Sequence, residues 1–259
     1  MYHFFVRPQN ITADRVVIDG DDVNHIKNVL RMKPGDEIAV SNGTDGKEYR
    51  CGILSLGEVI ECELRFIKEA DTELPVRVHL FQGLAKGDKM ETVVQKAVEL
   101  GAYEIIPVAM KRSVVRYDDK KSKAKTARLR TIAEAAAKQS TRAVIPDVHD
   151  VLSTKEAIEY AKSFDKILVP YELEGVSTDE GGAMDFRADV FARTKRVMES
   201  LKDVSSVGIF IGPEGGFDCA EIEALKAAGA DIITLGRRIL RTETAGMTVL
   251  GWLIYILEA

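Results

Sequence analysis

Two glycine-bearing stretches near the end of the chain decide its fold class: IGPEGGF at Ile211–Phe217 and LGRRILRTETAG at Leu235–Gly246. Each one begins as a short apolar segment ends, and these segments, Ser206–Ile211 and Asp231–Leu235, are predicted strands. In an open α/β sheet, ligands bind outside the carboxyl ends of the strands, where glycine lets the backbone approach them closely. The two stretches therefore predict a backbone-lined ligand cleft.

A third predicted strand ends in the same way, at Leu168–Tyr171, where Pro170 stiffens the turn. The alternative for IGPEGGF is a tight strand-to-helix turn, in which Gly215 and Gly216 supply positive φ angles. Neither GxGxxG nor GxxxxGK[ST] occurs in the sequence, so it supports neither dinucleotide binding nor a P-loop.

Strands and helices alternate from Pro75 onward, which is typical of a parallel sheet covered by helices. The further predicted strands are Val76–Gln82, Glu104–Val108 and Lys166–Val169. The predicted helices are Lys89–Leu100, Lys123–Ser140, Asp189–Lys202 and Asp218–Ala228. Asp88 with Glu91, and Asp218 with Glu221, have the spacing of reciprocal helix caps. Residues 175–184 are rich in glycine and acids and are predicted to form a loop.

The N-terminal part differs, since it consists mainly of short β segments. These are His3–Val6, Val16–Ile18, Glu37–Val40 and Glu61–Ile67. One helix is predicted among them, over Asp22–Met32, with Asp21 or Asp22 as its cap. We therefore expect a small barrel-like domain over residues 1–72 and an α/β domain over residues 73–259.

The last helix is predicted to begin at Glu243, with Thr242 as its cap. Apolar residues lie on nearly every side of this helix, which one domain core does not obviously cover. These are Met247, Val249, Leu250, Trp252, Leu253, Ile254, Ile256 and Leu257. A dimer interface would cover the remainder, and complete burial within one subunit is the alternative.

The composition narrows the function classes. The chain has 259 residues, 46% of them hydrophobic, and no apolar run of the roughly 20 residues that a membrane span needs. Its start does not resemble a signal peptide, so a cytoplasmic location is expected. Three scattered cysteines and four scattered histidines predict neither disulfides nor a metal site. They are Cys51, Cys62, Cys219, His3, His25, His79 and His149.

A net charge of −5 does not by itself favour a nucleic-acid partner, but the charges are unevenly distributed. Between Lys111 and Arg130 there are nine basic and two acidic residues, so this segment carries +7. It could form a basic face that binds RNA, or it could be a solvated loop and helix start.

IGPEGGF followed by LGRRILRTETAGMT resembles the RsmE family of SPOUT methyltransferases. Further segments are similar to the family in the same order, so that the resemblance covers essentially the whole chain. They are KNVLRMKPGD (Lys27–Asp36), QGLAKGDKMETVVQKAVELG (Gln82–Gly101), KRSVVR (Lys111–Arg116) and AAAKQSTRAVIP (Ala135–Pro146). Arg237 stands where the family often has proline and Lys138 where it often has glutamate, which puts RNA contacts rather than the cofactor site in doubt.

The resemblance implies a PUA-like RNA-binding β-barrel, a SPOUT domain with a trefoil knot, a homodimer, and methylation of N3 of a uridine in 16S ribosomal RNA. It also implies that the three strand-end loops hold S-adenosylmethionine (SAM). The expected cofactor-binding residues are Leu168, Val169, Pro170, Ile211, Gly212, Pro213, Glu214, Gly215, Gly216, Leu235, Gly236, Ile239, Leu240, Thr242, Thr244 and Ala245. The alternative for Glu214 is that it is only a residue of the turn and does not contact the cofactor.

Uridine N3 carries a proton on the base-pairing edge, so its methylation requires an unpaired base and loss of that proton. We expect Arg241, with Arg238 nearby, to stabilise negative charge on the uracil oxygens, because guanidinium is a permanent planar donor. Glu243 is a candidate proton acceptor, and a first-turn acid favoured by the helix dipole is the alternative.

The expected RNA contacts are basic or polar residues in both domains, each of which could instead be a surface charge or a helix-end residue. They are Arg7, Lys27, Arg31, Lys33, Arg112, Arg116, Gln139 and Arg142. The expected partner is ribosomal RNA or the small ribosomal subunit. Two other functions stay open: a SPOUT methyltransferase acting on another ribosomal or transfer RNA nucleotide, and a non-catalytic RNA-binding assembly factor.

Overall fold

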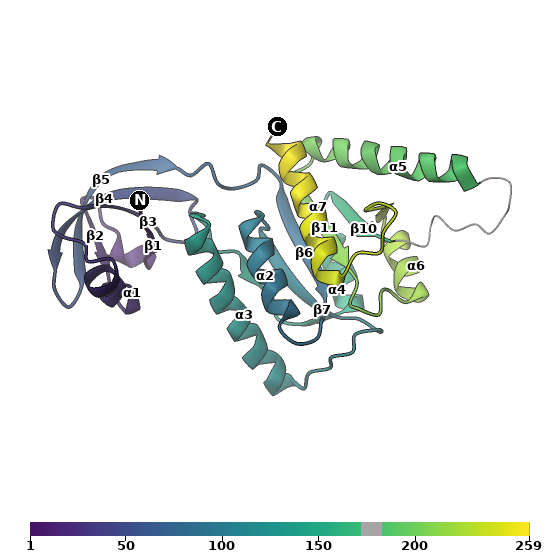
Figure 1. Cartoon of the computed structure of the whole chain (residues 1–259), viewed down its shortest axis with the longest axis horizontal. Helices are drawn as coiled ribbons and strands as arrows, with labels where there is room; N and C mark the ends of the chain where they lie inside the picture. Colours follow the sequence, from purple (N-terminus) through teal and green to yellow (C-terminus); the bar gives the residue numbers. More distant parts are fainter. Residues whose placement is uncertain (172–182, 259) are drawn as a thin grey trace. The chain divides into compact units, whose positions relative to one another are not determined.

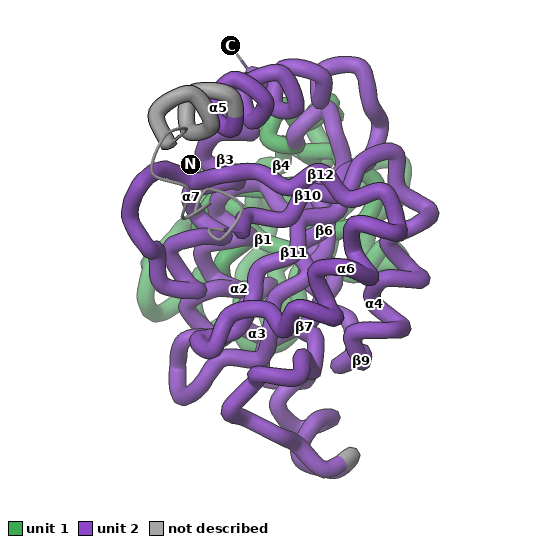
Figure 2. Tube along the Cα trace, turned by 90° about the vertical axis from the view of Figure 1, so that its right-hand side faces the viewer, with its two compact units in different colours: residues 1–73, 134–145 green, residues 74–133, 146–259 purple. Residues whose placement is uncertain are grey.

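The computed structural model describes residues 1–171 and 183–258 and divides into two compact units. Unit 1 contains residues 1–73 and 134–145, and unit 2 contains residues 74–133 and 146–259 (Figure 2). The first break falls one residue after the boundary expected from the sequence. Residues 134–145 also belong to unit 1, which was not predicted from the sequence. A single domain boundary cannot assign two separate segments to one unit.

Unit 1 is built on a curled five-stranded sheet in the order β1-β3-β4-β5-β2. Its strands are β1 (His3–Phe5), β2 (Arg15–Ile18), β3 (Glu37–Ser41), β4 (Lys47–Leu56) and β5 (Ile60–Glu69). Only β1 and β3 run parallel, and register shifts in the β4–β5 ladder interrupt its pairing. Such bulges bend and twist a strand, which helps a small sheet to wrap around its own core. Cys51 and Cys62 lie in that core as free thiols.

The helix expected over Asp22–Met32 is wrong as one continuous α-helix. The structure has a short α1 (Asp21–Asn24) that continues as the π-helical turn η2 (His25–Val29). Arg31 then takes a left-handed conformation, with φ of 53°, which ends the helical segment. The predicted aspartate cap is also wrong, because Gly20 occupies the cap position and no side chain caps the helix.

The end of α3 (Asp119–Gln139) and the segment after it are fixed within unit 1 by charged side chains. The ammonium of Lys138 lies 3.1 Å from Asp22 and 3.3 Å from Glu134. The guanidinium of Arg142 is buried and pairs with both carboxylate oxygens of Glu73. A guanidinium held in this way is not presented to a ligand, so Arg142 is corrected from an expected RNA contact to a structural residue of unit 1.

Unit 2 contains a seven-stranded parallel sheet in the order β12-β10-β11-β6-β7-β8, with β9 also paired to β7. Its strands are β6 (Arg77–Gly83), β7 (Glu104–Ala109), β8 (Asp147–Val148), β9 (Leu152–Ser153), β10 (Lys166–Pro170), β11 (Ser206–Ile211) and β12 (Asp231–Ile233). Its further helices are α2 (Lys89–Glu99), α4 (Thr154–Ala161), α5 (Ala183–Glu199), α6 (Cys219–Ala227) and α7 (Thr242–Leu257).

Alternate residues of the parallel strands face different helices, as period-two side-chain direction requires. Phe81 of β6 and Phe210 of β11 stack at 4.3 Å in a core that they share with residues of α4 and α6. On the other face, α7 lies against β11, α2 and α5 (Figure 1). The α/β class with a parallel sheet and a barrel-like N-terminal sheet is confirmed.

One of the two predicted reciprocal helix caps is present in the structure. Asp218 and Glu221 form the expected reciprocal cap of α6, and Gly101 follows α2 with φ of 85°. Asp88 does not cap α2 with its side chain, and Glu91 pairs with Arg128 instead. Most of the loop expected over residues 175–184 lies outside the described residues, and residues 183–184 begin α5.

The C-terminal helix α7 buries part of its apolar surface and leaves the rest accessible. Val249, Leu250 and Leu253 are buried, whereas the ring of Tyr255 is 77% exposed. Among the described residues, no helix is long and apolar enough to cross a membrane. In the same part of the chain, no group of three or more His, Cys, Asp or Glu side chains is arranged to hold a metal ion.

Candidate functional site

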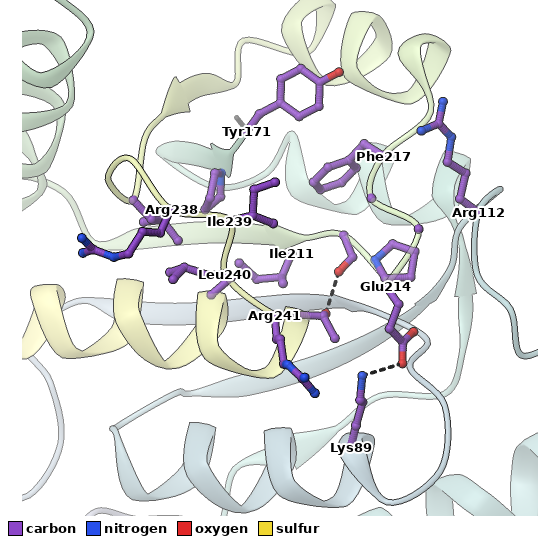
Figure 3. A pocket seen from close by; sticks show the side chains of 18 of the residues that line it. Lys89, Arg112, Tyr171, Ile211, Glu214, Phe217, Arg238, Ile239, Leu240 and Arg241 are labelled. Atoms are coloured by element: carbon purple, nitrogen blue, oxygen red, sulfur yellow. Dashed lines mark hydrogen bonds and ion pairs between the residues drawn. The ribbon is translucent and has the colours of Figure 1, made fainter. Parts of the chain in front are cut away.

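A cavity of about 500 Å³ lies in unit 2 at the carboxyl ends of β10 and β11, where the stretch after β12 returns to α7. This is the edge of the sheet at which a ligand cleft was predicted. The cavity is lined by Lys89, Arg112, Pro170, Tyr171, Ile211, Gly212, Pro213, Glu214, Gly215, Gly216, Phe217, Leu235, Gly236, Arg238, Ile239, Leu240, Arg241, Thr242 and Ala245. Most of the wall is backbone or apolar side chain, with the charged groups concentrated on a few residues (Figure 3).

Glycines let the walls of the cavity approach one another. A Cβ on Gly215 would lie 2.8 Å from the carbonyl oxygen of Arg112, so the turn after β11 packs directly on the segment after β7. Gly216 and Gly236 have φ angles of 68° and 111°, a region that side chains disfavour. The tight-turn alternative is therefore right for Gly216 and wrong for Gly215, which does not have a positive φ, and the turn also forms part of the cavity wall.

Thr242 joins the three segments that meet beneath the cavity. Its hydroxyl donates to the carbonyl oxygen of Gly212 at 2.6 Å and accepts from the side-chain amide of Gln82 at 2.8 Å. The predicted cap role of Thr242 is wrong, because α7 begins at this residue and no side chain caps it. The hydroxyl instead satisfies buried polar groups at the ends of β6 and β11.

Removing that hydroxyl is expected to lower the stability of the protein. In Thr242→Val, the Gly212 carbonyl would lose the hydroxyl donor and the Gln82 amide would lose an acceptor, at a cost of about 1–3 kcal/mol. Urea denaturation measures the free energy of unfolding. Thr131→Val is the matched control, because its exposed hydroxyl donates to a carbonyl oxygen within α3 and has no other partner in the described part of the chain. Equal midpoints for the two variants would contradict this role of Thr242.

Glu214 belongs to a small charged cluster at the cavity wall. One carboxylate oxygen accepts from the backbone N–H of Lys86 at 3.0 Å and lies 3.1 Å from the Lys89 ammonium. Partial burial raises the pKa of Glu214, but these two contacts together hold the pKa below its ordinary value. Glu214 is therefore an ionised residue that both lines the cavity and holds the loop before α2.

Glu243 points to the same ammonium rather than lining the cavity. One of its carboxylate oxygens lies 3.6 Å from Lys89 Nζ and is buried without a hydrogen-bond partner among the described residues. Its position in the first turn of α7 agrees with the helix-dipole alternative. The geometry thus favours a structural role for Glu243 over proton transfer.

Three arginines predicted from the sequence do line the cavity: Arg112, Arg238 and Arg241. Arg112 lies 3.8 Å from Asp218, and Lys111 lies 3.1 Å from the same carboxylate. The hydrogen bond from Lys111 is the main reason that the pKa of Asp218 is lowered. Within the described part of the chain, no carboxylate pairs with Arg241. Its guanidinium is therefore available to a ligand.

Most of the expected cofactor residues come together, and three do not line the cavity. Leu168 and Val169 are completely buried in β10, directly before the lining residue Pro170, and Thr244 is exposed on α7. Sequence reasoning missed Lys89, which comes from α2, and Tyr171 and Phe217, whose rings lie 6.3 Å apart at the wall. Tyr171 and Phe217 are the last residues of the segments Leu168–Tyr171 and Ile211–Phe217. Their place at the cavity could therefore have been predicted from the sequence.

The expected RNA residues other than Arg142 are exposed. In unit 1, Arg7 pairs with Asp19, and Lys27 donates to the carbonyl oxygen of Gly57 at 3.0 Å. Arg31 is itself the left-handed residue after η2, Lys33 follows it by two positions, and Gln139 ends α3. In unit 2, Arg116 lies in the basic segment next to the cavity residue Arg112.

Two family models match successive parts of the chain. The family model described as an RNA methyltransferase domain matches residues 72–254, and that described as an RNA methyltransferase PUA domain matches residues 18–62. A Bacillus subtilis protein named ribosomal RNA small subunit methyltransferase E is 40% identical over 100% of this chain and 98% of its own length. The chain belongs to this RNA methyltransferase family. The expected RsmE membership is therefore confirmed.

Solved structures of methyltransferases share the whole fold. A ribosomal RNA small subunit methyltransferase E from Neisseria gonorrhoeae, bound to S-adenosyl methionine, has a TM-score of 0.78 and 28% identity, covering 99% of this chain and 98% of its own. A methyltransferase from Legionella pneumophila, in complex with its bound cofactor SAM, has a TM-score of 0.75 and 26% identity, covering 98% of each chain. Methyltransferase E relatives thus share the fold that positions this cavity.

Proposed function

We propose that this protein is a SAM-dependent methyltransferase that methylates N3 of a specific uridine in 16S ribosomal RNA. The observation that carries the proposal is the glycine-walled cavity at the carboxyl ends of β10 and β11, in a chain of the methyltransferase E family. The cavity has the size of small-molecule sites and combines an apolar wall with a few polar groups, as such sites do.

The residues at the cavity fit SAM. Ile211, Leu235 and Leu240 offer apolar surface to an adenosine moiety, and the three glycines of the loop 212–216 let its backbone approach the ligand. The acidic side chain Glu214 is available to a polar or cationic part of the cofactor. When bound, SAM supplies an activated methyl group on a sulfonium.

The task of the protein is to hold an unpaired uracil at the cavity and to stabilise negative charge on its carbonyl oxygens as the N3 proton leaves. Arg241 lines the cavity without a carboxylate partner among the described residues, and Arg238 lines it from the same loop. A guanidinium keeps its charge at every relevant pH and offers a planar set of donors. We assign this stabilisation to Arg241, with Arg238 in support.

RNA binding is assigned to exposed basic and polar residues in both units. Arg112 lines the cavity, Arg116 is an exposed residue of the same basic segment of unit 2, and Arg7, Lys27, Arg31, Lys33 and Gln139 are exposed in unit 1. Contacts of this kind position an RNA backbone but do not select a base. Recognition of one uridine therefore depends on the shape of the RNA, and a ribosomal substrate agrees with a cytoplasmic location.

A homodimer is part of this proposal. The exposed Tyr255 on α7 and the 84% exposed Ile239 beside the cavity leave apolar surface that a second subunit would cover. Sedimentation equilibrium is expected to give twice the mass of one chain. The trefoil knot expected from the family stays a prediction.

Calorimetry with SAM tests the cofactor site directly. We expect saturable binding with one site per chain, and no binding to a folded protein would favour the alternative of an RNA-binding factor without catalysis. Mass spectrometry of nuclease digests from cells that lack the protein tests the substrate. We expect loss of methyluridine from small-subunit RNA, and loss of another methylated nucleotide would support a different RNA target.

A further inference from the structure

Lys89 is the one charged residue at the cavity that contacts two carboxylates among the described residues. Its ammonium lies 3.1 Å from Glu214 and 3.6 Å from Glu243, which come from the loop after β11 and the first turn of α7. Lys89 itself is the first residue of α2. Three elements that are distant in the sequence therefore meet at one ammonium.

The two carboxylates depend on this ammonium to different degrees. Glu214 also accepts from the backbone N–H of Lys86. Glu243 has a buried oxygen without a hydrogen-bond partner among the described residues, so Lys89 is the cation that compensates its charge. A partly buried carboxylate that loses its partner is left with an uncompensated charge, which favours a new ion pair with a cation within reach.

Arg241 is the cation that such a carboxylate would take. It lies two residues before Glu243 and lines the same cavity as Lys89 and Glu214. Figure 3 shows its side chain extending toward the side of the cavity on which the pair Lys89–Glu214 lies. An ion pair with either carboxylate would occupy donors that the uracil oxygens need.

We propose that Lys89 is a positioning residue that holds Glu214 and Glu243 and thereby leaves the Arg241 guanidinium free for the RNA base. This inference rests on the proposed function. If Lys89 had only a structural role, its loss would weaken SAM binding. If it positions the carboxylates, its loss should lower kcat by allowing Arg241 to form an ion pair, with SAM binding unchanged.

The test compares Lys89→Met with Lys96→Met. Lys96 is a lysine of the same helix, and among the described residues its ammonium pairs only with Glu99. With undermethylated small ribosomal subunits and saturating SAM, kcat of Lys89→Met should fall about 10-fold or more, and that of Lys96→Met should not change. Calorimetry should give similar SAM dissociation constants for both variants. Lys89→Arg should restore most of the turnover.

A second substitution distinguishes the positioning role of Lys89 from a purely structural one. Of the two carboxylates that would compete for Arg241, Glu214 keeps its contact with the Lys86 N–H, whereas Glu243 keeps none among the described residues. Adding Glu243→Gln to Lys89→Met therefore removes the stronger competitor, so kcat should rise about 5-fold or more above that of the single variant. A crystal structure of Lys89→Met should show Arg241 paired with Glu214 or Glu243. Lys89→Gln replaces the methionine variant if that variant does not fold.

Three results would overturn the inference. They are unchanged kcat in Lys89→Met, a weakened SAM affinity that accounts for the loss of turnover, and an Arg241 that stays unpaired in the variant. An unaltered protein that transfers no methyl group to the subunits would instead reject the proposed function, so the two failures are distinguishable.

Discussion

Arg241→Ala is expected to bind SAM as the unaltered protein does and to lose most of its methyl transfer. Removing one donor that stabilises developing negative charge lowers kcat by roughly 100- to 1,000-fold in other enzymes. The guanidinium of Arg241 lines the cavity and pairs with no carboxylate among the described residues, so its loss should mainly affect the reacting base. Single-turnover transfer of labelled methyl groups measures the rate, and calorimetry measures cofactor binding.

Arg237→Ala is the matched control for this prediction. Arg237 is an exposed arginine in the same loop and does not line the cavity. Its loss should leave transfer at saturating RNA close to that of the unaltered protein. Near-normal turnover in Arg241→Ala would remove Arg241 from the mechanism, and loss of SAM binding would assign it to the cofactor site.

Gly83→Ala is expected to disrupt the cofactor site from beneath. A Cβ on Gly83 would lie 2.6 Å from the backbone nitrogen of Pro213 and 3.0 Å from the carbonyl carbon of Gly212. Because these are backbone atoms in the cavity wall, the turn after β11 must move. We expect SAM affinity to fall by about 10-fold or more and stability to fall by about 1–3 kcal/mol.

Gly57→Ala controls for the loss of a glycine. A Cβ there would meet only the carbonyl oxygen of Val59, at an ordinary 3.6 Å, and its backbone does not need a positive φ. Calorimetry and urea denaturation of the two variants should therefore differ clearly. If Gly83→Ala keeps full affinity for SAM, the loop 212–216 does not hold the cofactor as proposed.

Local signals in the sequence predicted the elements around the site. Strand β11 occupies the predicted residues Ser206–Ile211, and the caps of Asp218 and Glu221 form as expected. Both depend on residues within a few positions of one another. The same kind of signal marks Ser153 and Glu156 as the cap of α4, which sequence reasoning overlooked.

Contacts between distant residues explain where prediction failed. Thr242 looked like a helix cap, but its hydroxyl bonds to Gln82, 160 residues away in the chain. Lys89 carried no local sign of its two carboxylate partners. Strand β4 was missed because Gly52 and the register shifts near Cys51 and Ile53 interrupt its alternating pattern.

Family resemblance supplied what local patterns did not. The glycines of IGPEGGF are equally consistent with a plain turn, and only their combination with LGRRILRTETAG and the other segments pointed to a cofactor. The structure adds that IGPEGGF and LGRRILRTETAG line one cavity, in which Arg241 pairs with no carboxylate among the described residues. The family resemblance was misleading for Arg142. It was expected to contact RNA, but its guanidinium forms an ion pair with Glu73 inside unit 1.

Mapping of the methylated base tests directly whether the protein methylates N3 of a uridine in 16S ribosomal RNA. Small ribosomal subunits from cells that lack the enzyme are incubated with the protein and methyl-labelled SAM, and the modified nucleotide is located by nuclease digestion and mass spectrometry. The account predicts one labelled uridine in 16S ribosomal RNA, methylated at N3. Label on another base, on another position of uracil, or on no nucleotide of the small subunit would contradict it.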